Sequence, residues 1–126
     1  MFCDTHCHIL SEYYDDINAI LEESKEAGVS RVINAGYNYE SSKEVIELVK
    51  KYPEMYGVAG LHPENIDEKF DYGIFDNLDK KIVGIGEIGL DYHYTKDNKD
   101  KQIEVFERQL DIAEKLNLPV VIHSRE

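Results

Sequence analysis

The chain has 126 residues, of which 42% are hydrophobic and 32% charged, as in an ordinary globular domain with a core. No apolar run approaches the ~20 residues of a membrane-spanning helix. The N-terminal segment also lacks the basic and apolar regions of a signal peptide, so we expect a cytoplasmic protein. The net charge of −12 argues against non-specific nucleic-acid binding through a basic patch. A phosphate-bearing substrate stays possible, because bound divalent metals can reverse the local field.

The first half of the chain predicts alternating strands and helices. A short strand at residues 2–4 is followed by a helix at residues 17–27, whose apolar residues share one face and which Gly28 terminates. A second strand covers residues 31–35. The next helix is predicted to begin at a capping box of Ser41 and Glu44, because these side chains can satisfy free backbone N–H groups.

The second half continues the alternation. A third strand is predicted at residues 56–61, a short and weakly patterned helical segment near residues 71–78, and a fourth strand at residues 82–86. The clearest helix covers residues 100–116, with apolar residues three or four apart, and a fifth strand follows at residues 119–123. The strands are rich in Val and Ile and do not alternate with polar residues, as expected of strands buried on both faces.

This strict alternation predicts an α/β fold of parallel strands with right-handed crossovers. Its closed form is the eight-stranded (β/α) TIM-type barrel, which typically takes ~250 residues. We therefore expect residues 1–126 to form the N-terminal part of one such barrel domain, about its first half. An open sheet of five strands would expose apolar surface and an unpaired edge, which favours self-association.

Polar side chains follow four of the five predicted strands, at the face where active sites of (β/α) barrels lie. In strand order they are His6 and His8, His62, Glu87 and Asp91, and His123 and Arg125. Residues two apart on a strand project to the same side, so His6 and His8 can ligate one metal ion. Glu87 lies in a glycine-rich run, where the backbone can pack closely around a carboxylate that needs a partner such as a metal. Imidazole and carboxylate together suit Zn²⁺, Mn²⁺ or Mg²⁺.

Each of these residues also has a plainer interpretation. A single His-x-His occurs by chance, His62 before Pro63 could belong to a turn, and Asp91 could cap a turn. His123 could be a satisfied histidine at a strand end, and His93 in a polar loop is expected to be exposed. The joint pattern favours the metal site.

The two cysteines flank this motif. We expect Cys3 and Cys7 to be unpaired thiols, buried or half-buried, because residues four apart on a strand are too distant for a disulfide. Cys7 lies between two inward-pointing residues and should therefore point the other way.

Four segments resemble those of the TatD family of metal-dependent deoxyribonucleases. They are DTHCH (residues 4–8), GLHP (60–63), GEIGLDY (86–92) and VIHSR (121–125). Lys101, Gln102, Phe106, Gln109 and Leu110 are similar to that family too. The resemblance implies an amidohydrolase-like (β/α) barrel that hydrolyses phosphodiesters, chiefly as a 3′-to-5′ exonuclease on DNA.

The same resemblance implies a role for each matching residue. His6 and His8 would ligate one of two divalent metal ions (Zn, Mn or Mg), His123 would ligate the second, and Glu87 would bridge them. His62 and Arg125 would contact the scissile phosphate. Family members also use a His after the sixth strand and a catalytic Asp after the eighth, and both positions would lie beyond residue 126.

Two other interpretations stay open. The chain could be a catalytically incompetent fragment, or a related metal-dependent hydrolase of amides or esters. The combination of GLHP with GEIGLD favours the nuclease.

Overall fold

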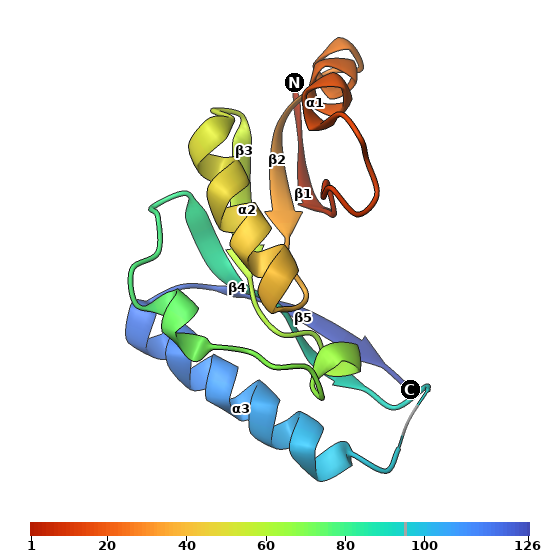
Figure 1. Ribbon diagram of the computed structural model, residues 1–126, viewed down its shortest axis with the longest axis vertical. Coiled ribbons are helices and arrows are strands. Elements are labelled where there is room, and N and C mark those ends of the chain that lie inside the picture. The colour runs from red at the N-terminus through yellow and green to blue at the C-terminus, as the bar shows by residue number, and fades with distance from the viewer. Residues whose placement is uncertain (95) are drawn as a thin grey trace.

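The five predicted strands form one parallel sheet in the order β1-β2-β3-β4-β5 (Figure 1). The structure is a computed structural model that describes residues 1–94 and 96–126. The strands are β1 (Phe2–Cys7), β2 (Val29–Ala35), β3 (Met55–Ala59), β4 (Ile82–Asp91) and β5 (Val120–Arg125). Each strand pairs with the next along the chain, as in the first half of a (β/α) barrel, so the predicted fold class is confirmed.

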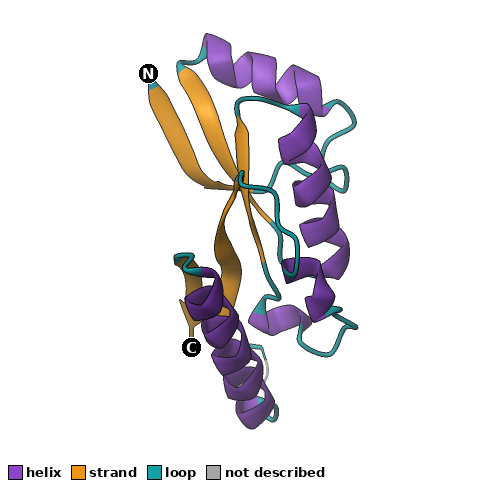
Figure 2. Cartoon of the chain, turned by 90° about the vertical axis from the view of Figure 1, so that its left-hand side faces the viewer, coloured by secondary structure: helices purple, strands orange, loops and turns teal. Residues whose placement is uncertain are grey.

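Three α-helices pack against this sheet. They are α1 (Ile17–Glu26), α2 (Tyr39–Lys51) and α3 (Lys99–Leu116), which contact β2, β3 and β4 respectively. Figure 2 shows α1 and α2 on the same side of the strongly twisted sheet. None of the helices that the structure describes is long and apolar enough to cross a membrane.

The third crossover differs from the prediction. Instead of one helix near residues 71–78 it contains two 3₁₀ helices, η1 (Pro63–Asn65) and η2 (Tyr72–Phe75). The Asp71 carboxylate accepts the backbone N–H of Gly73 at 2.9 Å, which closes a tight turn. A short polar side chain that bonds to nearby backbone in this way competes with a regular helix.

The start of α2 was also predicted wrongly, by three residues. Asn38 caps the helix by accepting the N–H of Ser41 at 2.9 Å, and Ser41 Oγ accepts the N–H of Asn38 at 3.0 Å. The capping box therefore consists of Asn38 and Ser41. Glu44, its predicted member, instead accepts the backbone N–H of Ser11 at 2.8 Å and ties the segment after β1 to α2. The predicted stop at Gly28 is confirmed, because its φ of 93° follows the C-cap of α1.

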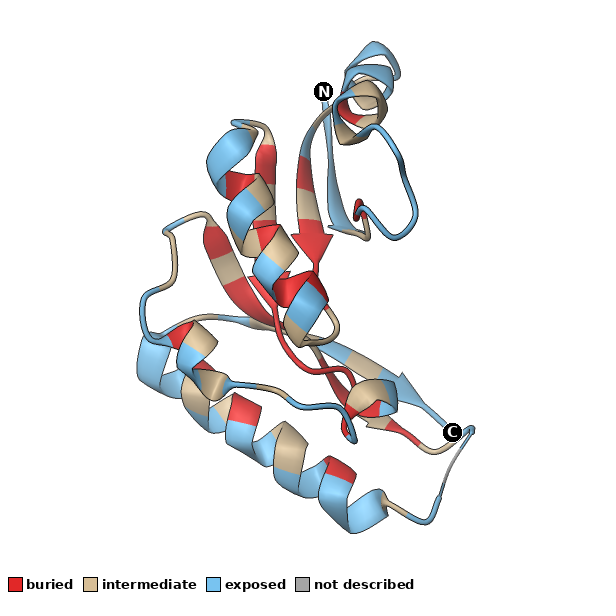
Figure 3. Cartoon of the chain, in the orientation of Figure 1, coloured by how far each residue is buried: buried red, intermediate tan, exposed pale blue. Residues whose placement is uncertain are grey.

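The core lies under the helices and leaves both edges of the sheet open. One apolar cluster includes Leu21, Val45 and Met55, and a second lies under α3. In Figure 3 the buried residues are concentrated on β2, β3 and β4, whereas β1 and β5 are mostly exposed or half-buried. Phe2 on β1 is 71% exposed and Ile122 on β5 is 56% exposed. The expected exposure of apolar edge surface is confirmed, and self-association stays a prediction.

Gly89 allows β4 to approach β5 at the level of the polar residues. Its φ is 148°, a conformation that favours glycine, and it lies opposite His123 in the strand register. A Cβ atom at this position would overlap the carbonyl oxygen of His123. Because Gly89 has no side chain, the backbone of His123 can lie this close to β4.

Substitution of Gly89 by alanine should destabilise the fold, because it forces a strained φ and separates β4 from β5. We expect a loss of about 1–3 kcal/mol of unfolding free energy, measured by urea denaturation. Gly73→Ala is the matched control, since its nearest contact would be the movable Asp71 carboxylate at 3.0 Å. Equal midpoints for the two variants would contradict this account of Gly89.

Candidate metal centre

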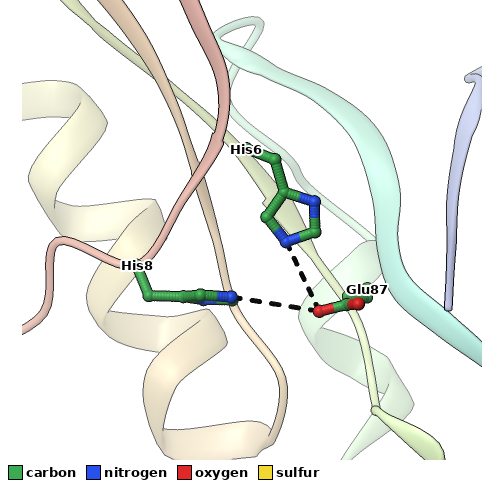
Figure 4. Close-up of side chains that lie close together, drawn as sticks. All are labelled: His6, His8 and Glu87. Atoms are coloured by element: carbon green, nitrogen blue, oxygen red, sulfur yellow. Dashed lines mark ion pairs between the residues drawn. The ribbon is translucent and has the colours of Figure 1, made fainter.

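The carboxylate of Glu87 lies among four imidazoles. Its Oε2 is 3.4 Å from His6 Nε2 and 3.9 Å from His8 Nε2. Its Oε1 is 3.1 Å from His123 Nδ1 and 4.0 Å from His62 Nε2. The Glu87 side chain is only 13% exposed. The two carboxylate oxygens thus face two different pairs of histidines, and Figure 4 shows the first pair, His6 and His8, converging on one oxygen.

The strand ends bring these residues together as the alternating pattern predicted. His6 lies on β1, His8 directly after it, and His123 on β5. Glu87 was predicted to follow the fourth strand but lies within β4, because this strand continues to pair with β5 as far as Asp91. Its pairing with β3 ends earlier, at Ile85, so Glu87 lies where β4 has separated from β3.

His8 is oriented by the end of β2. Its Nδ1 lies 2.8 Å from the carbonyl oxygen of Ala35, and because a carbonyl only accepts hydrogen bonds, Nδ1 carries the proton. The lone pair of a neutral His8 is then on Nε2, which faces Glu87. Metal-ligating histidines typically donate one ring N–H to such a carbonyl and bind the metal through the other nitrogen, as His8 is arranged to do. The second strand carries no predicted site residue, yet it contributes this backbone carbonyl.

His123 is oriented by Asp91, a residue that was predicted to lie at the end of the fourth strand but was given no role other than a possible turn cap. Its Nε2 lies 2.8 Å from Asp91 Oδ2, and the Asp91 side chain is 2% exposed. Burial raises the pKa of Asp91, but hydrogen bonds from Arg125, His123 and the backbone N–H of His93 outweigh it and lower this pKa to about 2. An ionised Asp91 keeps the proton on Nε2 of a neutral His123, which leaves the Nδ1 lone pair directed at Glu87. The predicted turn-capping contact, from the N–H of His93 at 3.0 Å, is present as well.

The spacing of Glu87 and Asp91 is the signal that could have given Asp91 a role beside Glu87. Residues four apart on a strand point to the same side, as the two histidines of the His-x-His do at a separation of two.

His62 carries its proton on the opposite ring nitrogen from His8. Its Nδ1 accepts the backbone N–H of Glu64 at 3.1 Å, so a neutral His62 carries its proton on Nε2, the atom that faces Glu87. Burial lowers the pKa of His62, and the neighbouring His123, whose ring centroid is 4.3 Å away, lowers it further. His62 is thus arranged as a hydrogen-bond donor. The turn interpretation also holds, because His62 caps η1.

Two groups of side chains in this cluster could hold a metal ion. One consists of His6, His8 and Glu87, and the other of His62, Glu87 and His123, with the ligand atoms of each group within 4.8 Å of one another. Nitrogen and carboxylate donors in this combination suit Zn²⁺ or Mn²⁺. The fixed proton on His62 Nε2 makes His62 the least suitable ligand of the second group.

Arg125 lies beside this cluster and is held by two carboxylates. Its Nε and Nη2 lie 2.9 and 2.7 Å from Asp91 Oδ2, and Nη2 also lies 2.8 Å from Glu64 Oε1. The predicted contact with a phosphate stays a prediction.

The cysteines play no part in the cluster. Both are free, and the thiol of Cys7 donates to the carbonyl of Ile33 at 3.4 Å. Cys7 packs against the apolar core, whereas His6 and His8 face Glu87, so Cys7 points the other way, as predicted. Burial, with a smaller contribution from Asp4, raises the pKa of Cys7 to about 12, so it is not a thiolate at neutral pH. Cys3 is exposed, contrary to the prediction, because β1 is an edge strand. His93 is exposed as predicted.

Four buried polar side chains hold the backbone around the site residues, and the sequence analysis missed all four roles. Each bonds to both the N–H and the C=O of one residue near a strand end. Asn34 binds Ile9, at 2.8 Å for both bonds, and Ser42 binds Gly60, at 3.1 Å for both. Ile9 directly follows His8, so Asn34 fixes the chain immediately after that histidine.

The other two are glutamines of α3. Gln109 bonds to the N–H and C=O of Leu61 at 2.7 and 3.1 Å, directly before His62. Gln102 bonds to the N–H and C=O of Asp91, at 2.8 Å for both. The signal for these roles is two amides seven residues apart on the apolar face of a predicted helix, where a polar side chain needs partners.

Comparison with known proteins agrees with this geometry. The model of the family described as TatD related DNase matches residues 3–126. YabD, an uncharacterized metal-dependent hydrolase of Bacillus subtilis (strain 168), is 37% identical over 131 residues, which cover 100% of this chain and 51% of the relative. TatD of Salmonella typhimurium (strain LT2), named a 3′-5′ ssDNA/RNA exonuclease, is 28% identical over 92% of this chain and 46% of its own length.

A solved structure of a TatD homolog has a similar fold. The crystal structure of YJJV, a TatD homolog from Escherichia coli K12, superposes with a TM-score of 0.88 at 31% identity, over 99% of this chain and 51% of that chain. The chain thus spans about half the length of the curated relatives it matches. Because the family match extends over almost every residue, the chain belongs to the family of TatD-related DNases, which are metal-dependent hydrolases.

Proposed function

We propose that the protein is a metal-dependent phosphodiesterase that removes nucleotides from the 3′ end of DNA. The observation that carries the proposal is the position of the Glu87 carboxylate between two pairs of histidines, with His8 and His123 each held in a ligating tautomer. The family description as a DNase and the exonuclease name of the Salmonella relative support the choice of substrate.

The proposed centre takes two divalent ions. His6, His8 and Glu87 Oε2 would hold the first, and His123 with Glu87 Oε1 the second, because the two oxygens of Glu87 face different histidines. Nitrogen donors favour Zn²⁺ or Mn²⁺ over Mg²⁺. When bound, such ions would supply Lewis acidity to a phosphoryl group. Two divalent cations would also offset the repulsion between a phosphate and a chain of net charge −12.

His62 is proposed to bind substrate rather than metal. Because its Nδ1 accepts the N–H of Glu64, its Nε2–H is available to donate to a phosphate oxygen beside Glu87. Arg125 is proposed as a second phosphate contact. Asp91 holds its Nε next to the site, and its Nη2 could exchange Glu64 for a phosphate oxygen in a charge-assisted hydrogen bond.

Asp91 is proposed as the positioning residue of His123. It contacts the imidazole nitrogen away from Glu87, so it would act on a metal only through the orientation and basicity of His123. Removal of such an outer partner typically weakens metal affinity 10–100-fold.

The number of bound metal ions should depend on which of the two proposed sets of ligands is intact. After equilibrium dialysis against Zn²⁺ or Mn²⁺, elemental analysis should find two ions per chain, because two sets of donors face Glu87. The His6→Ala/His8→Ala double variant should lose one ion, His123→Ala the other, and Glu87→Gln should weaken both. His93→Ala is the control, because His93 is exposed and not part of either group. Wild-type metal content in the double variant would refute the site.

Hydrolysis should depend on metal and on Glu87. With Mn²⁺ present, 5′-labelled single-stranded DNA should shorten progressively from its 3′ end, and a panel of amides and esters should not be cleaved faster than DNA. Glu87→Gln should abolish the activity, and His62→Ala should lower it about 10²-fold through loss of a donor to developing charge. Absence of metal-stimulated DNA cleavage, or cleavage that persists in Glu87→Gln, would refute the proposal.

Acid titration should reveal the role of Asp91 in the metal-free protein. Its folded-state pKa of about 2 lies below the usual ~3.9, so ionised Asp91 stabilises the fold above about pH 4 and this contribution is lost as the pH falls toward 2. Asp91→Asn should be less stable at pH 7 by about 2 kcal/mol, from the loss of charge-assisted hydrogen bonds, and should lose less stability between pH 4 and pH 2. Urea denaturation across this pH range measures both effects.

Asp67→Asn provides the matched control for that measurement, because Asp67 forms an exposed ion pair with Lys101. Exposed pairs contribute roughly 0–1 kcal/mol, so this variant should follow the wild type. The same acid dependence in Asp91→Asn as in the wild type would contradict the assignment.

A further inference from the structure

The proposed metal centre opens into a cavity of about 230 Å³ that has an aromatic wall. His8, His62 and Glu87 line one part of the cavity, and the side chains of Tyr13 and Tyr37 line another. Neither tyrosine has a role in the metal centre proposed above. Their position beside a phosphate-handling centre is the unexplained feature of this face.

Tyr37 forms the rigid back of this wall. Its ring meets that of His8 edge-on, with centroids 6.0 Å apart, and its hydroxyl donates a hydrogen bond to Glu12. Its backbone N–H donates to Ser41 Oγ at 2.9 Å, at the start of α2.

Tyr13 forms the open front. Its hydroxyl lies 3.4 Å from that of Tyr37, and its backbone N–H donates to the carbonyl of Leu10 at 3.0 Å, so both ends of the residue are held. The residue is nevertheless 55% exposed. Tyr13 therefore presents ordered aromatic surface to solvent beside the cavity.

Charge decides which part of a nucleotide such a wall can bind. The chain has a net charge of −12, and Glu64 also lines the cavity, so phosphates are repelled away from the metal ions. A nucleobase is uncharged and has a π-face, and stacking on an aromatic side chain contributes about 1–3 kcal/mol per base whatever the sequence. An aromatic surface can thus bind an uncharged base without electrostatic repulsion from the negatively charged chain.

We infer that Tyr13, backed by Tyr37, is the stacking surface for the base of the nucleotide whose phosphate lies at the Glu87 centre. The inference rests on the proposed function and specifies its substrate further. Stacking uses the π-face that every base has, so we expect the site to bind the bases of unpaired nucleotides with little preference for sequence. Phosphodiesters without a base lose this contact.

The chain contains no tryptophan, which makes Tyr13→Trp a single fluorescent probe at the wall. The probe ligand is a cleavage-resistant phosphorothioate oligothymidylate added to the Zn²⁺-loaded protein. We expect saturable quenching of the tryptophan fluorescence, and at least fivefold weaker binding of an abasic strand of equal length. Tyr14→Trp is the matched control, because Tyr14 is the next residue, is 39% exposed and does not line the cavity. Equal quenching in both variants, or equal binding of the abasic strand, would overturn the inference.

A second pair of variants separates the ring from the hydroxyl. Tyr13→Ala should weaken binding of a labelled oligothymidylate about 5- to 100-fold, as measured by fluorescence anisotropy, because it removes the stacking surface. Tyr13→Phe keeps the ring and should bind within about twofold of the wild type. Both should keep wild-type metal content and thermal stability, since Tyr13 is 55% exposed and its side-chain hydrogen bond is to Tyr37, which is not a proposed metal ligand. Unchanged affinity in Tyr13→Ala would overturn the inference.

These outcomes are independent of catalysis. Absence of metal-stimulated DNA cleavage with base-dependent quenching at position 13 would refute the proposed function and leave the stacking surface in place. Metal-stimulated cleavage of DNA, with the same oligothymidylate affinity in Tyr13→Ala as in the wild type, would support the proposed function and overturn the stacking surface.

Discussion

The arrangement of this molecule depends on a nearly buried carboxylate. Glu87 is 13% exposed, and an ionised carboxylate removed from water is costly unless partners surround it. Its partners come from β1, β5 and the segment after β3, which are far apart in sequence and meet only because parallel strands end at one edge of the sheet. In the tautomers described above, His8 and His123 direct lone pairs at this carboxylate and only His62 presents an N–H to it, so bound metal ions would remove much of this cost. Stability and chemistry are thus coupled at one residue.

A parallel sheet leaves unpaired backbone groups where its strands separate, and this chain satisfies them with side chains. Asn34, Ser42, Gln102 and Gln109 each bond to both backbone groups of one residue, as a neighbouring strand would. Buried amides that are fully satisfied hold a single geometry, because any shift would leave a donor or acceptor without a partner. The positions of His62 and Asp91 are therefore fixed from α3, and that of His8 from β2.

The sequence pattern predicted the sheet, its parallel order and the convergence of His6, His8, Glu87 and His123, because these follow from alternation and strand-end geometry. It did not predict contacts that depend on tertiary packing. Asp91 could be identified as the partner of His123 only once β4 was known to continue beside β5. The α2 cap was predicted three residues too late, because residues 38–41 and 41–44 can each form a capping box. In the third crossover, the hydrogen bond of the Asp71 side chain to nearby backbone replaces the predicted helix with tight turns.

The contact between Gln109 and Leu61 joins residues 48 positions apart, and this separation bears on the order in which the molecule assembles. Contacts of long sequence separation form late, because the loop between them must be closed before they contribute. The pairing of β1, β2 and β3 and the packing of α1 and α2 require only the first 59 residues. His62 acquires its final position only when α3 has docked, and Glu87 gains His123 only when β5 has paired. The metal centre is thus expected to be completed in the last steps of folding, so that partly folded forms of the chain contain its histidines without their arrangement.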